Sequence, residues 1–162
     1  MAIILGWDWY EKAISHLIRS FVKDGVCATA IVGVGRGGAV PAAELAHYFN
    51  ILADKFGFIN MMRRVSEHGD LMEPKIFAFA IPNLSSADTL AIVEDIVYEG
   101  KTLAAAENLI MSNCAPKKII TASLAIEEGS KAPPDYYYFT TNEYLVFPWE
   151  RVYYLREAYR VS

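Results

Sequence analysis

Two short apolar runs, each followed by a glycine-bearing turn and a helical pattern, constrain the fold of this chain most. The first run covers residues 27–34 and the second residues 89–93. Both are shorter than a typical helix and show no polar alternation, which is typical of strands buried on both faces. Strand, turn and helix repeated in this way predict an α/β protein with a parallel β-sheet flanked by helices.

Periodicity and punctuation predict the other elements. Apolar residues at helical spacing indicate a helix over 7–23, which Gly25 ends as a C-terminal cap. Pro41 suits the first turn of a second helix. The full set is helices over 7–23, 41–50 and 101–113 and strands over 27–34, 51–59, 75–81, 89–93 and 118–126, with a long loop over 60–74, a turn-rich segment over 82–88, and short strands and turns after 127.

The length of the chain bounds its domain organisation. Its 162 residues match one domain at about 150 residues per domain, so we expect a single domain over 1–162. The last part, approximately 127–162, contains Pro133-Pro134 and a run of three tyrosines. We expect it to form a small C-terminal hood, because a segment of that size buries too little surface to fold alone.

Charge and hydropathy exclude several classes of partner. Lys and Arg number 15 and Asp and Glu 19, a net charge of −4, so no nucleic-acid partner is expected and any phosphate site must be local. No run reaches the roughly 18 apolar residues of a membrane helix, and the N-terminus lacks the pattern of a signal peptide. Cys27 and Cys114, without metal-ligand spacing, are expected to be reduced buried thiols of a cytoplasmic protein.

The first glycine turn has the composition of an anion site. It reads Gly33-Val34-Gly35-Arg36-Gly37-Gly38. Glycines let successive backbone amides approach an anion, the following helix adds its positive end, and Arg36 offers a matching cation. A tight strand-to-helix turn with a solvated arginine explains the same residues equally well.

The second turn combines acids with a phosphate-type loop. Glu94 and Asp95 follow the apolar run, and Gly100-Lys101-Thr102 opens the next helix. Adjacent acids suit sugar hydroxyls or Mg²⁺, whereas loop amides and a hydroxyl suit a phosphate. Together they describe a ribose 5-phosphate site. The alternative is an ordinary helix start with acids near the favourable end of its dipole.

At this point the sequence resembles a family. Residues 90–102 resemble the phosphoribosyl-pyrophosphate (PRPP) motif of the type I phosphoribosyltransferases, and Arg36-Gly37-Gly38 resembles their pyrophosphate loop. Tyr144-Leu145-Val146-Phe147-Pro148-Trp149-Glu150 resembles the base-binding end of the purine enzymes. The chain is most similar to short archaeal-type hypoxanthine or xanthine-guanine phosphoribosyltransferases, and the three motifs occur in the family's order.

The resemblance implies the type I phosphoribosyltransferase fold and a glycosyltransferase activity. Such an enzyme joins PRPP to a nucleobase, here a purine, and releases pyrophosphate and a nucleoside 5-monophosphate. It further implies Mg²⁺ as cofactor and a homodimer or higher homo-oligomer. The implied roles are catalysis by Glu94, Asp95 and Tyr98; 5-phosphate binding by Glu99 (through its amide), Gly100, Lys101 and Thr102; pyrophosphate binding by Gly35, Arg36 and Gly37; base binding by Tyr144, Leu145 and Glu127; and metal binding by Glu94, Asp95 and Glu150.

Three residues depart from the family pattern. Tyr98 stands where purine members carry Asp, and Glu99 stands where they carry Thr or Ser, so its carboxylate would repel the phosphate. Glu127 stands near the position where purine members carry a lysine that contacts the base. Lys131 fills that role if the loop is shifted. These departures favour a second hypothesis, a non-catalytic relative that senses nucleotides or acts as a regulatory or interaction protein.

Overall fold

The computed structural model describes residues 2–62 and 72–152. Its main element is a six-stranded sheet in which every neighbouring pair is parallel except the antiparallel pair β3–β4. Across the sheet the strands are β4 (Lys75–Ala80), β3 (Phe56–Met62), β2 (Ala30–Val34), β5 (Thr89–Val97), β6 (Lys118–Glu127) and β7 (Tyr136–Thr141).

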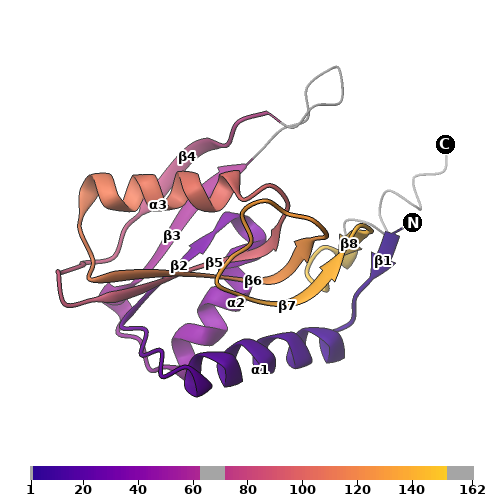
Figure 1. Ribbon diagram of the computed structural model, residues 1–162, viewed down its shortest axis with the longest axis horizontal. Helices are drawn as coiled ribbons and strands as arrows, with labels where there is room; N and C mark the ends of the chain where they lie inside the picture. The colour runs from indigo at the N-terminus through magenta and orange to yellow at the C-terminus, as the bar shows by residue number, and fades with distance from the viewer. Residues whose placement is uncertain (1, 63–71, 153–162) are drawn as a thin grey trace.

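Helices cover both faces of this sheet (Figure 1). On one face lie α1 (Trp7–Lys23) and α2 (Gly35–Tyr48), and on the other lies α3 (Lys101–Asn113). The amphipathic pattern of α1 places Ala13, Leu17 and Phe21 in the core with no exposed surface. This architecture confirms the predicted α/β fold with a parallel sheet flanked by helices.

Two apolar cores explain the unbroken runs that predicted the central strands. Ala91 and Val93 of β5 pack in the core beneath α1 and α2, whereas Leu90 and Ile92 pack in the core beneath α3. All five residues of β2 are buried as well. Because both faces of these strands are covered, no position along them accepts a polar side chain at low cost.

A second, two-stranded sheet joins the two ends of the described chain. Here β1 (Ala2–Ile4) pairs in parallel with β8 (Tyr144–Val146), and the Leu5 N–H donates to the Val146 carbonyl over 2.9 Å. The sequence analysis did not predict β1. It also placed all of 127–162 in the hood, whereas β7 is an edge strand of the main sheet.

Several element boundaries differ from the sequence prediction. The first buried strand begins at Ala30 rather than at 27, and Cys27 is exposed while Cys114 is half-buried. The prediction of two buried thiols is therefore wrong for Cys27. The reason is that 27–29 form an irregular connection before β2, in which the Thr29 N–H donates to the Thr89 carbonyl over 2.9 Å.

The strands near the expected loops are displaced too. The segment 51–55 contains a short 3₁₀ helix, η1 (Ala53–Lys55), and β3 continues to Met62, inside the expected loop. Residues 63–71 of that loop lie outside the described residues. Strand β5 runs through Glu94 and Asp95 to Val97, because β6 pairs with it over this whole length. No helix in the described part of the chain is long and apolar enough to cross a membrane.

Candidate functional site

The two glycine turns meet at the carboxyl ends of the parallel strands. Strands β2, β5 and β6 are parallel neighbours, so their carboxyl ends lie together. The start of α2 follows β2, the turn 98–100 and α3 follow β5, and the turn after Glu127 follows β6. Ligands of open α/β sheets bind at such an edge.

Glycines hold the first turn directly against the second. A Cβ atom on Gly37 would overlap the Asp95 carboxylate, and one on Gly38 would lie 2.9 Å from the Cα atom of Glu94. A side chain at Gly38 would push the two segments apart, because it would meet backbone atoms of Val93 and Glu94, whereas one at Gly37 would displace the Asp95 carboxylate. The sequence analysis identified the two loops as two motifs, and the structure shows that they are in contact.

The first turn of α2 presents backbone amides at this contact. Gly35 has a φ of +65°, a backbone conformation that favours glycine. Instead of the broad glycine turn that we expected, α2 begins at Gly35, and no described side chain caps it. Its first N–H groups therefore have no partner within the helix and can donate to an anion. Arg36 is exposed beside them.

The loop after β5 is a tight glycine turn at the start of α3. Gly100 is buried with a φ of +77°, and a Cβ atom there would lie 2.6 Å from the Cβ atom of Ala132. Lys101 forms an ion pair with Glu73, with 2.6 Å between Nζ and Oε1. Glu99 is exposed. Its carboxylate therefore lies in a medium closer to water, where repulsion at about 4 Å falls to roughly 1 kcal/mol.

The two acids at the end of β5 lie in a desolvated position. Asp95 is half-buried, and its Oδ1 accepts the Ile96 N–H over 3.0 Å. Burial, together with the nearby Glu150 carboxylate, raises the pKa of the Asp95 carboxyl to about 6. The Oε2 atom of Glu94 is buried as well. A cation or a sugar hydroxyl here would favour the ionised acids.

Tyr98 connects the acids to the expected base-binding end. Burial raises the pKa of the Tyr98 hydroxyl to about 12, and the acidic groups of Asp95, Tyr144, Glu127 and Glu150 contribute in the same direction. Tyr98 therefore lies within electrostatic reach of these four groups. The hydroxyl keeps its proton at neutral pH, which makes it a hydrogen-bond donor and not a general base.

The residues expected at the base-binding end differ in their exposure and in their contacts. Tyr144 begins β8 and is 60 % exposed, whereas the Leu145 side chain is 3 % exposed and lies in the core. Only the backbone of Leu145 can meet a base. Glu150 closes its own turn, since its Oε2 accepts the Phe147 N–H over 3.2 Å.

The expected metal ligands do not form a ready-made cage. Among residues 2–62 and 72–152, no group of three or more His, Cys, Asp or Glu side chains is arranged to hold a metal ion. The donor set still suits Mg²⁺, which is usually held by one or two carboxylates together with the phosphates of the substrate. Binding of Mg²⁺ by Glu94, Asp95 and Glu150 stays a prediction.

Two residues of the site were missed in the sequence. Ala132 covers Gly100, and Glu73 pairs with Lys101. Pro133-Pro134 marked a stiff segment after Ala132 but did not show where it packs. Glu73 gave no local signal, because its partner lies 28 positions away along the chain.

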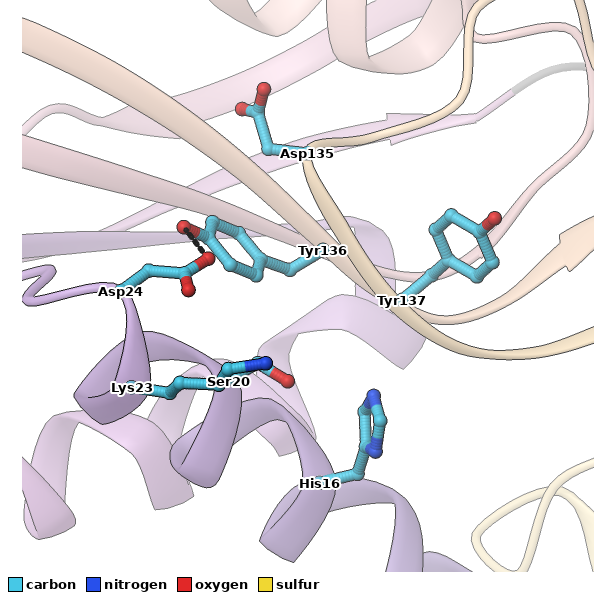
Figure 2. A pocket seen from close by; sticks show the side chains of 7 residues that line it. All are labelled: His16, Ser20, Lys23, Asp24, Asp135, Tyr136 and Tyr137. Carbon is cyan, nitrogen blue, oxygen red and sulfur yellow. Dashed lines mark hydrogen bonds between the residues drawn. The ribbon is translucent and has the colours of Figure 1, made fainter.

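A cavity of about 240 Å³ lies between α1 and the amino end of β7 (Figure 2). Its walls include His16, Lys23, Asp24 and Tyr136, and the Tyr136 hydroxyl donates to Asp24 over 3.2 Å. The glycine turns and the acids of the carboxyl edge are not among its lining residues. It is therefore separate from the candidate site.

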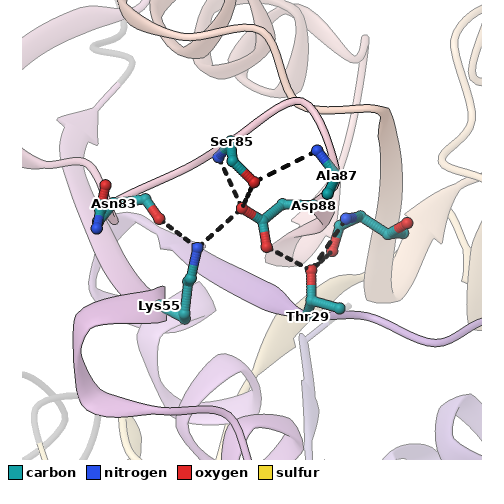
Figure 3. Close-up of polar contacts among 7 residues, drawn as sticks. Thr29, Lys55, Asn83, Ser85, Ala87 and Asp88 are labelled. Carbon is teal, nitrogen blue, oxygen red and sulfur yellow. Dashed lines mark hydrogen bonds and ion pairs between the residues drawn. The ribbon is translucent and has the colours of Figure 1, made fainter.

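A buried carboxylate ties the amino ends of the strands together (Figure 3). The Thr29 hydroxyl donates to Oδ1 of Asp88 over 2.8 Å. The Oδ2 atom accepts from the Lys55 ammonium over 2.8 Å and from the N–H and hydroxyl of Ser85 over 2.7 and 2.9 Å. These donors, Lys55 foremost, hold the pKa of the Asp88 carboxyl well below its usual range. This cluster holds β2, η1 and β5 in place.

We expect Asp88→Asn to lower the free energy of unfolding by about 2 kcal/mol at pH 7, because Lys55 loses its partner. The folded carboxyl resists protonation, so the wild type loses this stabilisation as the pH falls below about 4. Urea unfolding at pH 7 and at lower pH measures both effects. The exposed Asp54→Asn on η1 is the control, with a change below about 0.5 kcal/mol. An equal loss in both variants would contradict the assignment.

Fold and site together define an α/β protein in which a glycine turn that can accept an anion faces a pair of acids where the parallel strands end. Comparison with known proteins gives the family: the phosphoribosyl transferase domain model matches residues 4–153. The chain therefore belongs to the phosphoribosyltransferase family, as the sequence motifs predicted. Membership supports PRPP-dependent phosphoribosyl transfer, a glycosyltransferase-type reaction, as its general activity.

Individual relatives agree with this assignment. A purine phosphoribosyltransferase structure from Pyrococcus horikoshii is 30 % identical and superposes with a TM-score of 0.76, covering 92 % of this chain and 93 % of the other. The Helicobacter pylori xanthine-guanine-hypoxanthine phosphoribosyltransferase shares the fold, with a TM-score of 0.78 at 20 % identity over 98 % and 100 % of the two chains. The bifunctional protein pyrR of Enterococcus faecalis is 26 % identical over 129 residues, 76 % of this chain and 72 % of that protein.

Proposed function

We propose that this protein transfers the 5-phosphoribosyl group from PRPP to a purine base and releases pyrophosphate. The observation that supports the proposal is the contact between Gly37 and Asp95, which brings the glycine turn at the start of α2 against the acids at the end of β5. The purine assignment is supported by the similarity to the Pyrococcus horikoshii purine enzyme over most of the chain.

The chain's own residues supply binding and orientation. Glu94 and Asp95 would accept hydrogen bonds from the ribose hydroxyls. The amides of Glu99 to Thr102 would hold the 5-phosphate, and those of the first turn of α2 would hold pyrophosphate with Arg36. A ring nitrogen of the base then forms a bond to C1 of the ribose as the bond from C1 to the pyrophosphate oxygen breaks, and the proton that this nitrogen loses passes to the departing pyrophosphate or to water. Catalysis would come from positioning and charge stabilisation.

Mg²⁺ belongs to the same proposal. Glu94 and Asp95, with Glu150 nearby, would hold the ion together with oxygens of PRPP. When bound, it would offset the negative charge of pyrophosphate beside these acids. The cytoplasmic location and the homo-oligomeric state expected from the sequence are also part of the proposal.

A second candidate is a non-catalytic relative that senses nucleotides. Two observations favour it: the Tyr98 hydroxyl keeps its proton, with a pKa raised by burial to about 12, and Glu99 places a carboxylate in the phosphate turn. Neither prevents nucleotide binding, but both weaken the case for turnover.

Calorimetric titration with PRPP, with and without Mg²⁺, is the first test. Metal-dependent binding, followed by pyrophosphate release when a purine base is added, supports the transferase. Binding without release under any base favours the sensor. No binding at millimolar PRPP would overturn the transferase, and titration with nucleoside monophosphates would then test the sensor.

We expect Glu99→Thr to tighten PRPP binding by about threefold to tenfold, because it removes a negative charge whose repulsion is screened by exposure. Titration calorimetry at low salt measures the change, and the exposed Glu11→Gln on α1 is the control. Equal affinity in wild type and Glu99→Thr would show that the carboxylate stays clear of the phosphate.

A further inference from the structure

The pairing of β5 with β6 determines to which face of the sheet Glu127 points. Val97 lies opposite Ile126 in the parallel register, and both are buried beneath α3. Successive residues of a strand point to opposite faces. Glu127, the next residue of β6, therefore points to the other face, on which α1 and α2 pack and where Asp95 lies against Gly37. Tyr98 follows Val97 directly after the end of β5.

Two consecutive glutamates at this place have different surroundings. Glu128 is exposed, its Oε2 accepts from the Asn142 amide over 2.7 Å, and its N–H donates to the Thr141 carbonyl over 3.2 Å. Glu127 is half-buried, and its carboxylate is one of the groups that act on Tyr98. Glu127 therefore faces the site, whereas Glu128 is held by the neighbouring strand end.

The hydrogen-bonding character of this end follows from these residues. A carboxylate only accepts hydrogen bonds, and the groups whose charges act on Tyr98 are all acidic. An exocyclic amine of a base donates to such an acceptor, whereas an exocyclic oxygen meets it with a second acceptor. A mismatched polar group in a partly buried site is left without a partner, which weakens binding.

We propose that Glu127 selects bases that carry an exocyclic amino group over bases that carry oxygen in its place. This inference rests on the proposed function, since it assigns the substrate class of the same site. Adenine over hypoxanthine and guanine over xanthine are the two pairs that express the choice. Glu127 accepts a hydrogen bond from the amine while the Tyr98 hydroxyl offers the neighbouring donor.

The test is calorimetric titration of the full chain with four nucleoside monophosphates. We expect AMP to bind about tenfold or more tightly than IMP, or GMP than XMP. The pair that shows the preference identifies which amine is read. Glu127→Gln is expected to abolish the preference and Glu127→Lys to reverse it, whereas Glu128→Gln keeps it.

Each outcome separates the two proposals. Equal affinities within both pairs, or loss of the preference in Glu128→Gln, overturns the role of Glu127 even if the protein transfers phosphoribosyl groups. A preference for amino-bearing nucleotides that depends on Glu127, without turnover, supports the role while the transferase proposal fails. Tighter binding of IMP and XMP by the wild type overturns it directly.

Discussion

Replacing Gly37 by alanine is expected to weaken PRPP binding about a hundredfold or more, equivalent to roughly 2.7 kcal/mol. A Cβ atom at this position would occupy the space of the Asp95 carboxylate. Either the carboxylate leaves its proposed ribose-binding position or the first turn of α2 moves away from the proposed phosphate position. Both responses separate the two parts of the proposed site.

The helix itself does not suffer from this change. Gly37 lies inside α2, where alanine is favoured over glycine by about 1 kcal/mol, so lost binding would reflect the displaced carboxylate. Titration calorimetry measures the effect. Gly25→Ala is the control, because Gly25 has a φ of +64° and nothing within 4 Å of its added Cβ atom. PRPP affinity within about threefold of wild type in Gly37→Ala would contradict the site.

Gly100→Ala is expected to weaken PRPP binding at least tenfold, about 1.4 kcal/mol, and to destabilise the protein. Its φ of +77° disfavours a side chain, which costs about 1 kcal/mol. In addition, the new Cβ atom would lie 2.6 Å from Ala132 Cβ and 2.7 Å from its carbonyl oxygen. The phosphate turn must shift to remove this overlap.

Gly129→Ala is a closely matched control for Gly100→Ala. Gly129 has a φ of +78° and nothing within 4 Å of an added Cβ atom. It therefore carries the same backbone strain without the overlap. We expect both variants to lose stability in urea unfolding, but only Gly100→Ala to lose PRPP affinity in calorimetry. Equal affinities in the two variants would mean that the contact with Ala132 does not shape the phosphate turn.

Part of the candidate site could be predicted from short stretches of sequence. The apolar run before Glu94 and the glycines around Arg36 identified the two loops, because strand burial and glycine turns are set by neighbouring residues. The packing of Gly37 on Asp95 was not visible, since these residues belong to turns after different strands. The predicted burial of Cys27 failed for a related reason: apolar neighbours in sequence do not reveal where a strand begins.

The sequence by itself determined the α/β class, the central strands and the two chemically distinct turns. These features follow from periodicity, from glycine and from paired acids, all of which act over a few residues. Only the tertiary structure decided that β1 pairs with β8, that Ala132 covers Gly100 and that Asn142 holds Glu128. These contacts join residues distant along the chain, so they depend on strand order and register, which no short stretch of sequence encodes.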